Sequence, residues 1–191
     1  ICKYIDMPIQ HASDSILRTM GRRTNKSELV HIISKLRDNI PDIAIRTTLI
    51  TGFPGETKEE HEELKAFVEE MKFDRLGVFT YSKEEDTPAA KMSGQIPASI
   101  KEQRQAEIME IQQKIAFKHS KEMIGKTLKI MIEGKIPDEE VLELSNRGEG
   151  SVYIGRTYKD APNVDGYIFL KSKGELLSGD FVDVMVTDAK E

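Results

Sequence analysis

The stretch from Asp42 to Met71 constrains the fold most, because it has the pattern of a strand, a tight turn and a helix. Side chains alternate in polarity over residues 43–50, with the period of two that a β-strand requires. The chain must turn at Gly52–Gly55, which holds two glycines and a proline. Thr57 and Glu60 then have the spacing of a helix capping box. The apolar residues that follow at helical spacing are Leu64, Phe67, Val68 and Met71.

The predicted strand has two unlike faces. One face holds Ile43, Ile45, Thr47 and Leu49, and the other holds Ala44, Arg46, Thr48 and Ile50. The first face is the more apolar, so we expect helices to cover it. The second carries an arginine and a threonine, so we expect it to face a polar interior. Ligands of α/β folds bind at the carboxyl ends of parallel strands, which places a candidate site at the end of this strand.

The pattern of strand and helix recurs on both sides of this stretch. Further strands are predicted over residues 4–10 and 75–81, and further helices after Ser13 and after Asn25. Strands that alternate with helices are typical of a parallel sheet of βα units. Three such units cannot close a barrel, and the chain begins at Ile1 rather than methionine. We therefore expect it to be a piece of a longer protein.

The last third of the chain has a different character. A long helix is predicted from a capping box at Ser99 and Glu102 to Gly125, and we expect it to act as a connector. About five short strands follow, which is typical of a small β-barrel. These predicted strands cover residues 128–132, 141–144, 151–154, 167–170 and 181–186.

Composition limits the classes of function. The net charge of −5 argues against a binder of polyanions, and the single cysteine, Cys2, excludes an internal disulfide and a multi-cysteine metal site. No apolar run reaches the roughly 18 residues of a membrane span. No signal peptide is visible, so a cytoplasmic location is expected.

Four segments, residues 4–23, 45–57, 78–90 and 155–166, resemble one family. They are similar to the carboxyl-terminal portion of the radical S-adenosylmethionine (radical SAM) methylthiotransferases, including their TRAM domain. The segments DMPIQH and DAPNVDG resemble the branch that modifies a ribosomal protein of the small subunit. The branch that modifies tRNA typically lacks the second segment.

The resemblance implies an α/β plus all-β fold in two domains. Residues 1–122 would be late βα units of a TIM-like radical SAM partial barrel with a connector helix, and residues 123–191 a five-stranded, OB-like TRAM barrel. The implied cofactors are S-adenosylmethionine and two 4Fe-4S clusters. The CxxxCxxC motif that holds the activating cluster is absent, so this chain alone is expected to hold no cluster and to be inactive.

Seven residues are candidates for binding S-adenosylmethionine: Gln10, His11, Arg46, Thr48, Gly52, Glu56 and Tyr81. Arg46 suits a carboxylate because its guanidinium is a fork of donors, although an internal ion pair with Asp6 is the alternative. The Gly52–Glu56 turn is either a simple βα connection or also part of an adenine pocket. The other histidines, His31, His61 and His119, lack the spacing of metal ligands. No catalytic residue and no metal ligand is assigned.

The expected function is the addition of a methylthio group to the β-carbon of an aspartate in small-subunit ribosomal protein twelve. Residues 123–191 contain 9 lysines and arginines against 13 acidic residues, which suits a basic protein partner better than RNA. A weak RNA contact through the TRAM domain stays open. The alternatives are a tRNA adenosine methylthiotransferase and a non-catalytic module that binds RNA or protein.

Overall fold

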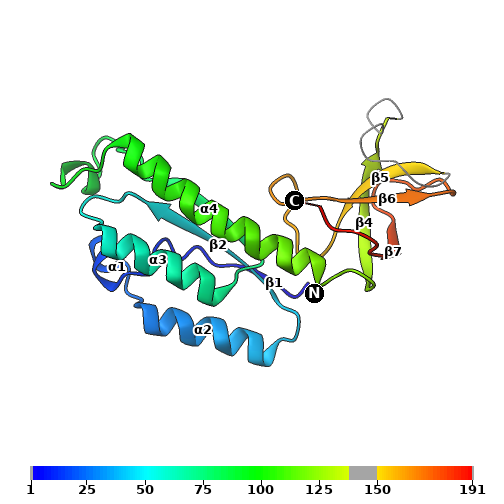
Figure 1. The fold of residues 1–191 in the computed structure, drawn as a ribbon, viewed down its shortest axis with the longest axis horizontal. Coiled ribbons are helices and arrows are strands. Elements are labelled where there is room, and N and C mark those ends of the chain that lie inside the picture. Colours follow the sequence, from blue (N-terminus) through cyan, green and yellow to red (C-terminus); the bar gives the residue numbers. More distant parts are fainter. Residues whose placement is uncertain (1, 138–149, 191) are drawn as a thin grey trace. The chain divides into compact units, whose positions relative to one another are not determined.

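A computed structural model describes residues 2–137 and 150–190, and the chain divides into two compact units. Residues 3–119 form one unit and residues 120–190 the other (Figure 1). The first contains β1 (Tyr4–Asp6), α1 (Asp14–Thr19), α2 (Lys26–Asn39), β2 (Ala44–Thr51), α3 (Lys58–Met71), β3 (Arg75–Thr80), the short 3-10 helix η1 (Ala89–Lys91) and most of α4 (Ala98–Lys121). The second contains β4 (Thr127–Lys135), β5 (Ser151–Arg156), β6 (Ile168–Ser172) and β7 (Phe181–Met185).

The first unit is built on a parallel sheet with the strand order β1-β2-β3, which confirms the predicted βα pattern. The first strand is shorter than the predicted 4–10, because its regular pairing with β2 stops after Met7: the N–H of Met7 still donates to the carbonyl of Arg46, but the N–H of Ile9 donates to the side chain of Thr47. The side chain of Thr47 partly fills this gap, donating to the carbonyl of Met7 at 2.8 Å. Regular pairing resumes at Gln10, which forms a bridge with Leu49.

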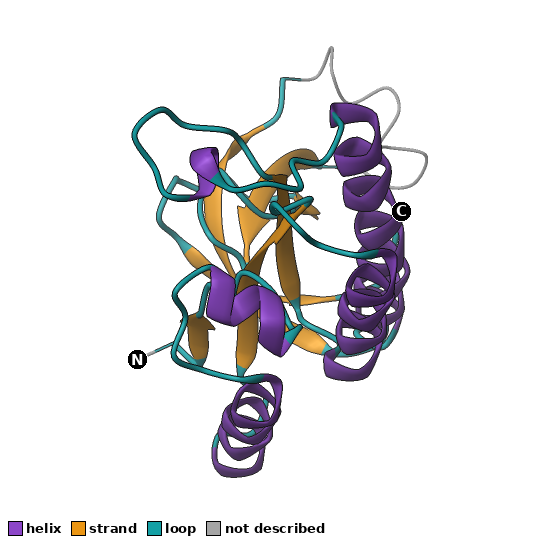
Figure 2. Cartoon of the chain, turned by 90° about the vertical axis from the view of Figure 1, so that its left-hand side faces the viewer, coloured by secondary structure: helices purple, strands orange, loops and turns teal. Residues whose placement is uncertain are grey.

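The prediction for the first face of β2 is confirmed. Ile43, Ile45 and Leu49 lie in the main hydrophobic core, which helices α2, α3 and α4 cover (Figure 1 and Figure 2). Arg46 and Thr48 lie on the other face and are half-buried. The core residues from the three helices are Leu29, Ile33, Leu64, Phe67, Val68, Met71 and Ile108.

Two of the predicted helix starts are confirmed in detail. The side chain of Thr57 accepts from the N–H of Glu60 at 3.2 Å, and Glu60 accepts from the N–H of Thr57 at 2.8 Å. Asn25 and Glu28 form the same reciprocal pair at the start of α2. The capping box at Ser99 is wrong, because α4 begins at Ala98 and Ser99 therefore lies inside its first turn.

Ser13 stands at the N-cap of α1, but its hydroxyl does not cap that helix. It forms hydrogen bonds with Ser15 and with Glu60 instead. The helix is positioned by these contacts with α3 and by the buried side chains of Ile16 and Leu17.

Helix α4 is an integral part of the first unit rather than simply a connector. Ile108 is fully buried, and Ile111 and Ile115 pack against the same core. The side-chain amides of Gln105 and Gln112 donate to the carbonyls of Val78 and Phe73, at 2.6 and 3.0 Å. These bonds connect α4 to β3 and to the segment that leads into it.

The second unit is a curled antiparallel sheet with the strand order β6-β5-β4-β7. Its core consists of Ile130, Ile132, Tyr153 and Leu170. Four of the five predicted strands are present, and the fifth, at 141–144, falls outside the described residues. Among the helices of the described ranges, none is both long and apolar enough to cross a membrane.

We predict that replacing Ile108 by alanine destabilises the protein by about 2–5 kcal/mol, because the change leaves a cavity between α4 and the sheet. Met109→Ala, on the exposed side of the same turn, should change stability by less than about 0.5 kcal/mol. Chemical denaturation measures both. Equal effects of the two substitutions would show that α4 does not belong to this core.

Candidate functional site

The segments that follow β1, β2 and β3 meet at one edge of the parallel sheet. We call residues 10–13, 52–56 and 81 the carboxyl rim. The N–H of Tyr81 donates to the carbonyl of Thr51 at 2.8 Å, and the rings of Phe53 and Tyr81 meet edge to face with 5.3 Å between centroids. The structure thus brings together five of the seven candidate residues: Gln10, His11, Gly52, Glu56 and Tyr81.

The side chain of Glu56 lies beneath the turn after β2 and binds its backbone. Its side chain is fully buried, and one carboxylate oxygen accepts from the N–H groups of Gly52 and Phe53, the latter at 3.1 Å. Gly52 has a φ of 71°, a conformation that glycine adopts without strain. The carboxylate therefore fixes the turn and does not face solvent.

The other carboxylate oxygen of Glu56 faces three nitrogen-bearing side chains, which together with it form the Glu56 cluster. Arg104 Nη1 lies 3.2 Å from Oε1, His61 Nδ1 lies 3.6 Å away and His11 Nε2 lies 3.9 Å away. His61 also reaches Glu107, with 3.0 Å between Nε2 and Oε2. The cluster joins the end of β1, the turn, α3 and α4 at one buried charge.

The orientation of the His11 ring follows from a local hydrogen bond. The N–H of Ser13 donates to His11 Nδ1 at 3.0 Å, so in the neutral ring the proton resides on Nε2. That proton faces Glu56, although 3.9 Å is too long for a hydrogen bond. The contact is therefore electrostatic.

The pKa of Glu56 reflects two opposing effects. Burial alone would raise it, but the contacts with His11 and His61 and the charge of Arg104 outweigh burial and lower the pKa to about 2. Contacts with Gln103, His61 and Lys65 likewise lower the pKa of Glu107 to about 2. Both carboxylates are ionised at neutral pH.

Two features of the carboxyl rim cost folding free energy unless another interaction compensates for them. The hydroxyl of Tyr81 is buried without a hydrogen-bond partner among the described residues. Gln10 has a φ of 73°, in the left-handed region that is uncommon for residues other than glycine. Unsatisfied polar groups and strained backbone cluster at functional sites, so both observations support a ligand at this edge.

Arg46 and Thr48 lie on β2 before its carboxyl end. Arg46 is three residues before Leu49, which pairs with Gln10 of the carboxyl rim, and three residues of a strand span roughly 10 Å. Its Nη1 lies 2.8 Å from Asp6 Oδ2, the internal ion pair that the sequence analysis gave as the alternative. The side chain of Asp6 is 42% exposed, so this pair is accessible from the second face of the sheet. A role of Arg46 in cofactor binding stays a prediction.

The residues of this chain do not fit an iron–sulfur cluster. Cys2 is the single cysteine of the chain and is exposed. Within residues 2–137 and 150–190, no group of three histidine, cysteine or acidic side chains is placed to hold a metal ion. S-adenosylmethionine fits better, since the carboxyl rim presents an unpaired Tyr81 hydroxyl and a glycine turn.

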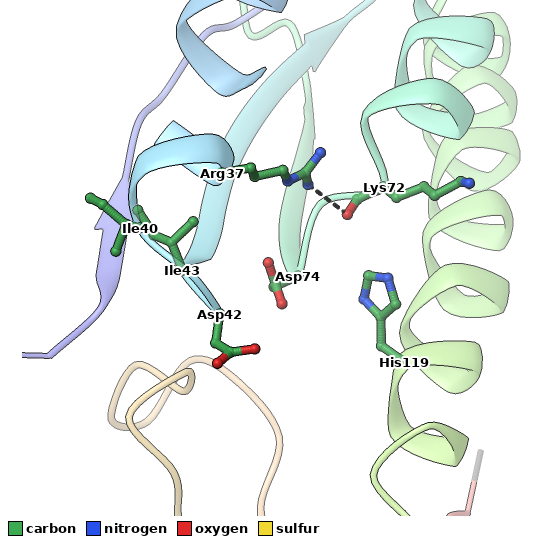
Figure 3. Close-up of a pocket in the computed structure, with 7 residues that line it drawn as sticks. All are labelled: Arg37, Ile40, Asp42, Ile43, Lys72, Asp74 and His119. Carbon is green, nitrogen blue, oxygen red and sulfur yellow. Dashed lines mark hydrogen bonds between the residues drawn. The ribbon is translucent and has the colours of Figure 1, made fainter. Parts of the chain in front are cut away.

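A pocket of about 330 Å³ lies at the opposite, amino-terminal end of the strands (Figure 3). Asp42 and Asp74, which line it, lie just before β2 and β3. Its polar groups already serve the fold, because Arg37 donates to the carbonyl of Lys72 at 3.1 Å and Asp74 accepts from the N–H of Ile45 at 3.0 Å. Because the pocket lies at the opposite end of the strands from the carboxyl rim, it is separate from the candidate site.

Sequence reasoning did not identify two members of the Glu56 cluster. His61 was considered only as a metal ligand, although it follows Glu56 by five residues and lies in the first turns of α3. That spacing was a usable local signal. Arg104 lies 48 residues from Glu56 in the chain, and no local pattern connects them.

We predict that Glu56→Gln lowers the free energy of unfolding at neutral pH by about 3 kcal/mol, because it leaves Arg104 without its buried charge partner. A lowered pKa means that the stabilisation is complete above about pH 4.5 and is lost as the pH falls toward 2. The variant should therefore lose less stability over that range than the original protein. Some acid dependence should persist through Glu107.

Urea denaturation at a series of pH values measures this effect. Glu62→Gln is the matched control, because Glu62 is a glutamate of α3 close to Glu56 in the chain, and its side chain is exposed where it pairs with Lys65. The control should cost less than about 1 kcal/mol. Parallel pH curves for Glu56→Gln and the original protein would contradict the buried charge cluster.

Comparison with known proteins agrees with the two-unit structure. The Radical SAM superfamily matches residues 1–68, and the TRAM domain family matches residues 124–191. Ribosomal protein uS12 methylthiotransferase RimO from Lachnoclostridium phytofermentans is 62% identical over 191 residues, which cover 100% of this chain and 41% of that protein.

Two further relatives with the same name show the same coverage. The protein from Thermoanaerobacter sp. is 48% identical over 100% of this chain and 41% of its own length. The protein from Desulfitobacterium hafniense is 45% identical over 99% of this chain and 40% of its own length. The chain thus spans about two fifths of the length of these relatives. The resemblance predicted from the sequence is confirmed: the chain has a radical SAM segment followed by a TRAM domain, and it is similar along its whole length to part of the uS12 methylthiotransferases.

Proposed function

We propose that the protein carrying this chain adds a methylthio group to the β-carbon of an aspartate in ribosomal protein uS12. The observation that carries the proposal is the 62% identity to a uS12 methylthiotransferase along the whole of this chain. The acidic TRAM segment also supports the protein-modifying branch. Such an enzyme acts on a ribosomal component in the cytoplasm.

In this proposal the parallel sheet is part of a TIM-like radical SAM barrel, and its second face lines the barrel interior. Three strands are too few to close a barrel. Likewise, the four strands of the second unit would be part of a five-stranded TRAM barrel. The proposed domain boundary lies between residues 122 and 123, at the end of α4.

The carboxyl rim and the second face of β2 would bind S-adenosylmethionine, which supplies the radical precursor when bound. Arg46 would orient the carboxylate of the methionyl group, with Thr48 beside it on the same strand. The Gly52–Glu56 turn would border the adenosyl group, and the Tyr81 hydroxyl would gain a hydrogen bond that no described residue gives it. Gln10 would complete the edge of the pocket, with the fully buried His11 behind it. Glu56 would act from beneath the turn rather than by touching the cofactor.

The two 4Fe-4S clusters of such an enzyme would be held by other parts of the protein. This chain has one cysteine, so the piece by itself would not turn over. Catalysis is therefore assigned to the complete protein, and this chain contributes binding and orientation.

The TRAM segment would contact the substrate protein. Its balance of 9 basic against 13 acidic residues favours a basic ribosomal protein over the phosphates of RNA. A weak RNA contact through this domain is compatible with the balance, whereas a tRNA substrate is the less favoured alternative. A binding module without catalysis is a further alternative for the isolated piece.

We predict that Arg46→Ala in the complete protein weakens binding of S-adenosylmethionine by about ten- to a hundredfold. A hydrogen bond to a charged group contributes about 1.5–3 kcal/mol, and 1.4 kcal/mol corresponds to a factor of ten. Arg46→Lys should recover part of the affinity, because an ammonium cannot form the paired contact of a guanidinium. Calorimetric titration of the folded protein measures the dissociation constants.

The matched control is Asp6→Asn, which removes the internal partner of Arg46 but keeps the arginine. Its affinity for S-adenosylmethionine should stay within about threefold of the original. If Arg46→Ala lowers thermal stability and leaves the affinity unchanged, Arg46 serves the internal ion pair and not the cofactor.

A further inference from the structure

Helix α4 contacts two different loops of the carboxyl rim through its first turns. Lys101 and Arg104 are three residues apart, so they lie on the same side of the helix. Arg104 reaches the turn after β2, and Lys101 reaches the segment after β3. These two loops contain three residues of the carboxyl rim: Gly52, Glu56 and Tyr81.

Arg104 holds both the main chain and the side chain of Glu56. Its Nη1 donates to the Glu56 carbonyl at 3.0 Å and lies 3.2 Å from the carboxylate oxygen Oε1. The side chain of Arg104 is 12% exposed, so little water competes for these contacts. Since Glu56 in turn binds the N–H groups of Gly52 and Phe53, Arg104 acts on the whole turn.

Lys101 holds the neighbouring loop and packs against the glycine of the turn. Its Nζ donates to the carbonyl of Tyr81 at 2.7 Å and lies 5.4 Å from the centre of the Tyr81 ring. A β-carbon built on Gly52 would stand 2.1 Å from Lys101 Cγ, so the lysine stem fills the space above that glycine. The carbonyl of Lys101 also accepts from the hydroxyl of Thr51 at 3.4 Å.

These contacts are poorly explained by stability alone. The helix is already packed by Ile108 and by the hydrogen bonds of Gln105 and Gln112. Buried ion pairs add little net stability, because the cost of removing the charges from water offsets their attraction. The contacts of Arg104 and Lys101 fix the distance between the Gly52–Glu56 turn and the Tyr81 segment.

We propose that Arg104 and Lys101 are positioning residues, which set the Gly52–Glu56 turn and the Tyr81 loop at the spacing that S-adenosylmethionine requires. This inference rests on the proposed function. Neither residue touches the cofactor. Each acts through a loop that does, so removing it loosens the site before it unfolds the protein.

The test compares Arg104→Met with Lys114→Met in the complete protein. Lys114 lies on the same helix, and its ion pair with Glu110 is exposed, so the control removes the same charge without touching a loop. Arg104→Met should weaken binding of S-adenosylmethionine by about tenfold, which corresponds to 1.4 kcal/mol. Lys101→Met should have an effect in the same direction, and Lys114→Met should have none. Calorimetric titration is done well below the melting temperature of each variant.

Hydrogen exchange without cofactor provides an independent readout. The amides of Gly52 and Phe53 should exchange about tenfold faster in Arg104→Met than in Lys114→Met, while amides in the middle of β2 keep their protection. Arg104→Lys should restore part of both the protection and the affinity, since it keeps a donor near Glu56.

The two proposals fail in different ways. If the original protein does not bind S-adenosylmethionine, the proposed function fails, and the exchange of the turn amides still decides whether α4 holds the loops. If the original protein binds the cofactor and Arg104→Met binds it equally well, the positioning role is overturned even where thermal stability falls. Unchanged exchange at Gly52 and Phe53 would overturn it as well.

Discussion

The buried carboxylate of Glu56 is the interaction on which the carboxyl rim depends. Four segments converge on this one charge, two of them distant from the turn in sequence, and each contributes a group that water would otherwise solvate. The backbone of the turn donates two N–H groups, the segment after β1 provides His11, and helices α3 and α4 provide His61 and Arg104. An unpaired carboxylate at this depth would be too costly, so the charge requires all of these segments to be in place.

The alternation of side chains along β2 gives the parallel sheet two different faces. Side chains such as Ile45 and Leu49 pack under the helices, while Arg46 and Thr48 on alternate positions are left for the other face. The rigid core side holds the strands in register, so the loops at their carboxyl ends start from fixed points. This arrangement explains how a short turn with two glycines can keep a defined shape.

Local features of the fold could be predicted from the sequence, and contacts between distant segments could not, apart from the Arg46–Asp6 ion pair that was given as an alternative. The helix-covered face of β2 and the capping box at Thr57 follow from spacings of two and three residues, and both are confirmed. Ser99 satisfied the same capping spacing and was wrong, because the carbonyl of Pro97 accepts from the N–H groups of Ile100 and Lys101, so the helix starts before Ser99. The first strand was predicted too long, since the alternation continues through Pro8 while its hydrogen bonding does not.

The candidate site shows the same limit. Residues at strand ends could be proposed because α/β folds place ligands there, but their partners could not. Glu56 was expected to line a pocket, and instead its side chain is buried beneath the turn. There it pairs with Arg104 of α4, which lies 48 residues further along the chain. The role of α4 was underestimated for the same reason: its contacts with the loops come from polar side chains that no amphipathic pattern reveals.

A crystal structure of the complete protein with bound S-adenosylmethionine would test the role of the carboxyl rim most directly. We expect the cofactor to lie at the carboxyl rim against the Gly52–Glu56 turn, within hydrogen-bond distance of the Tyr81 hydroxyl. The Glu56 carboxylate should remain beneath the turn, paired with Arg104. A cofactor in the pocket near Arg37 and Asp74, or a Glu56 side chain turned outward to bind it, would show that the carboxyl rim is not the binding site.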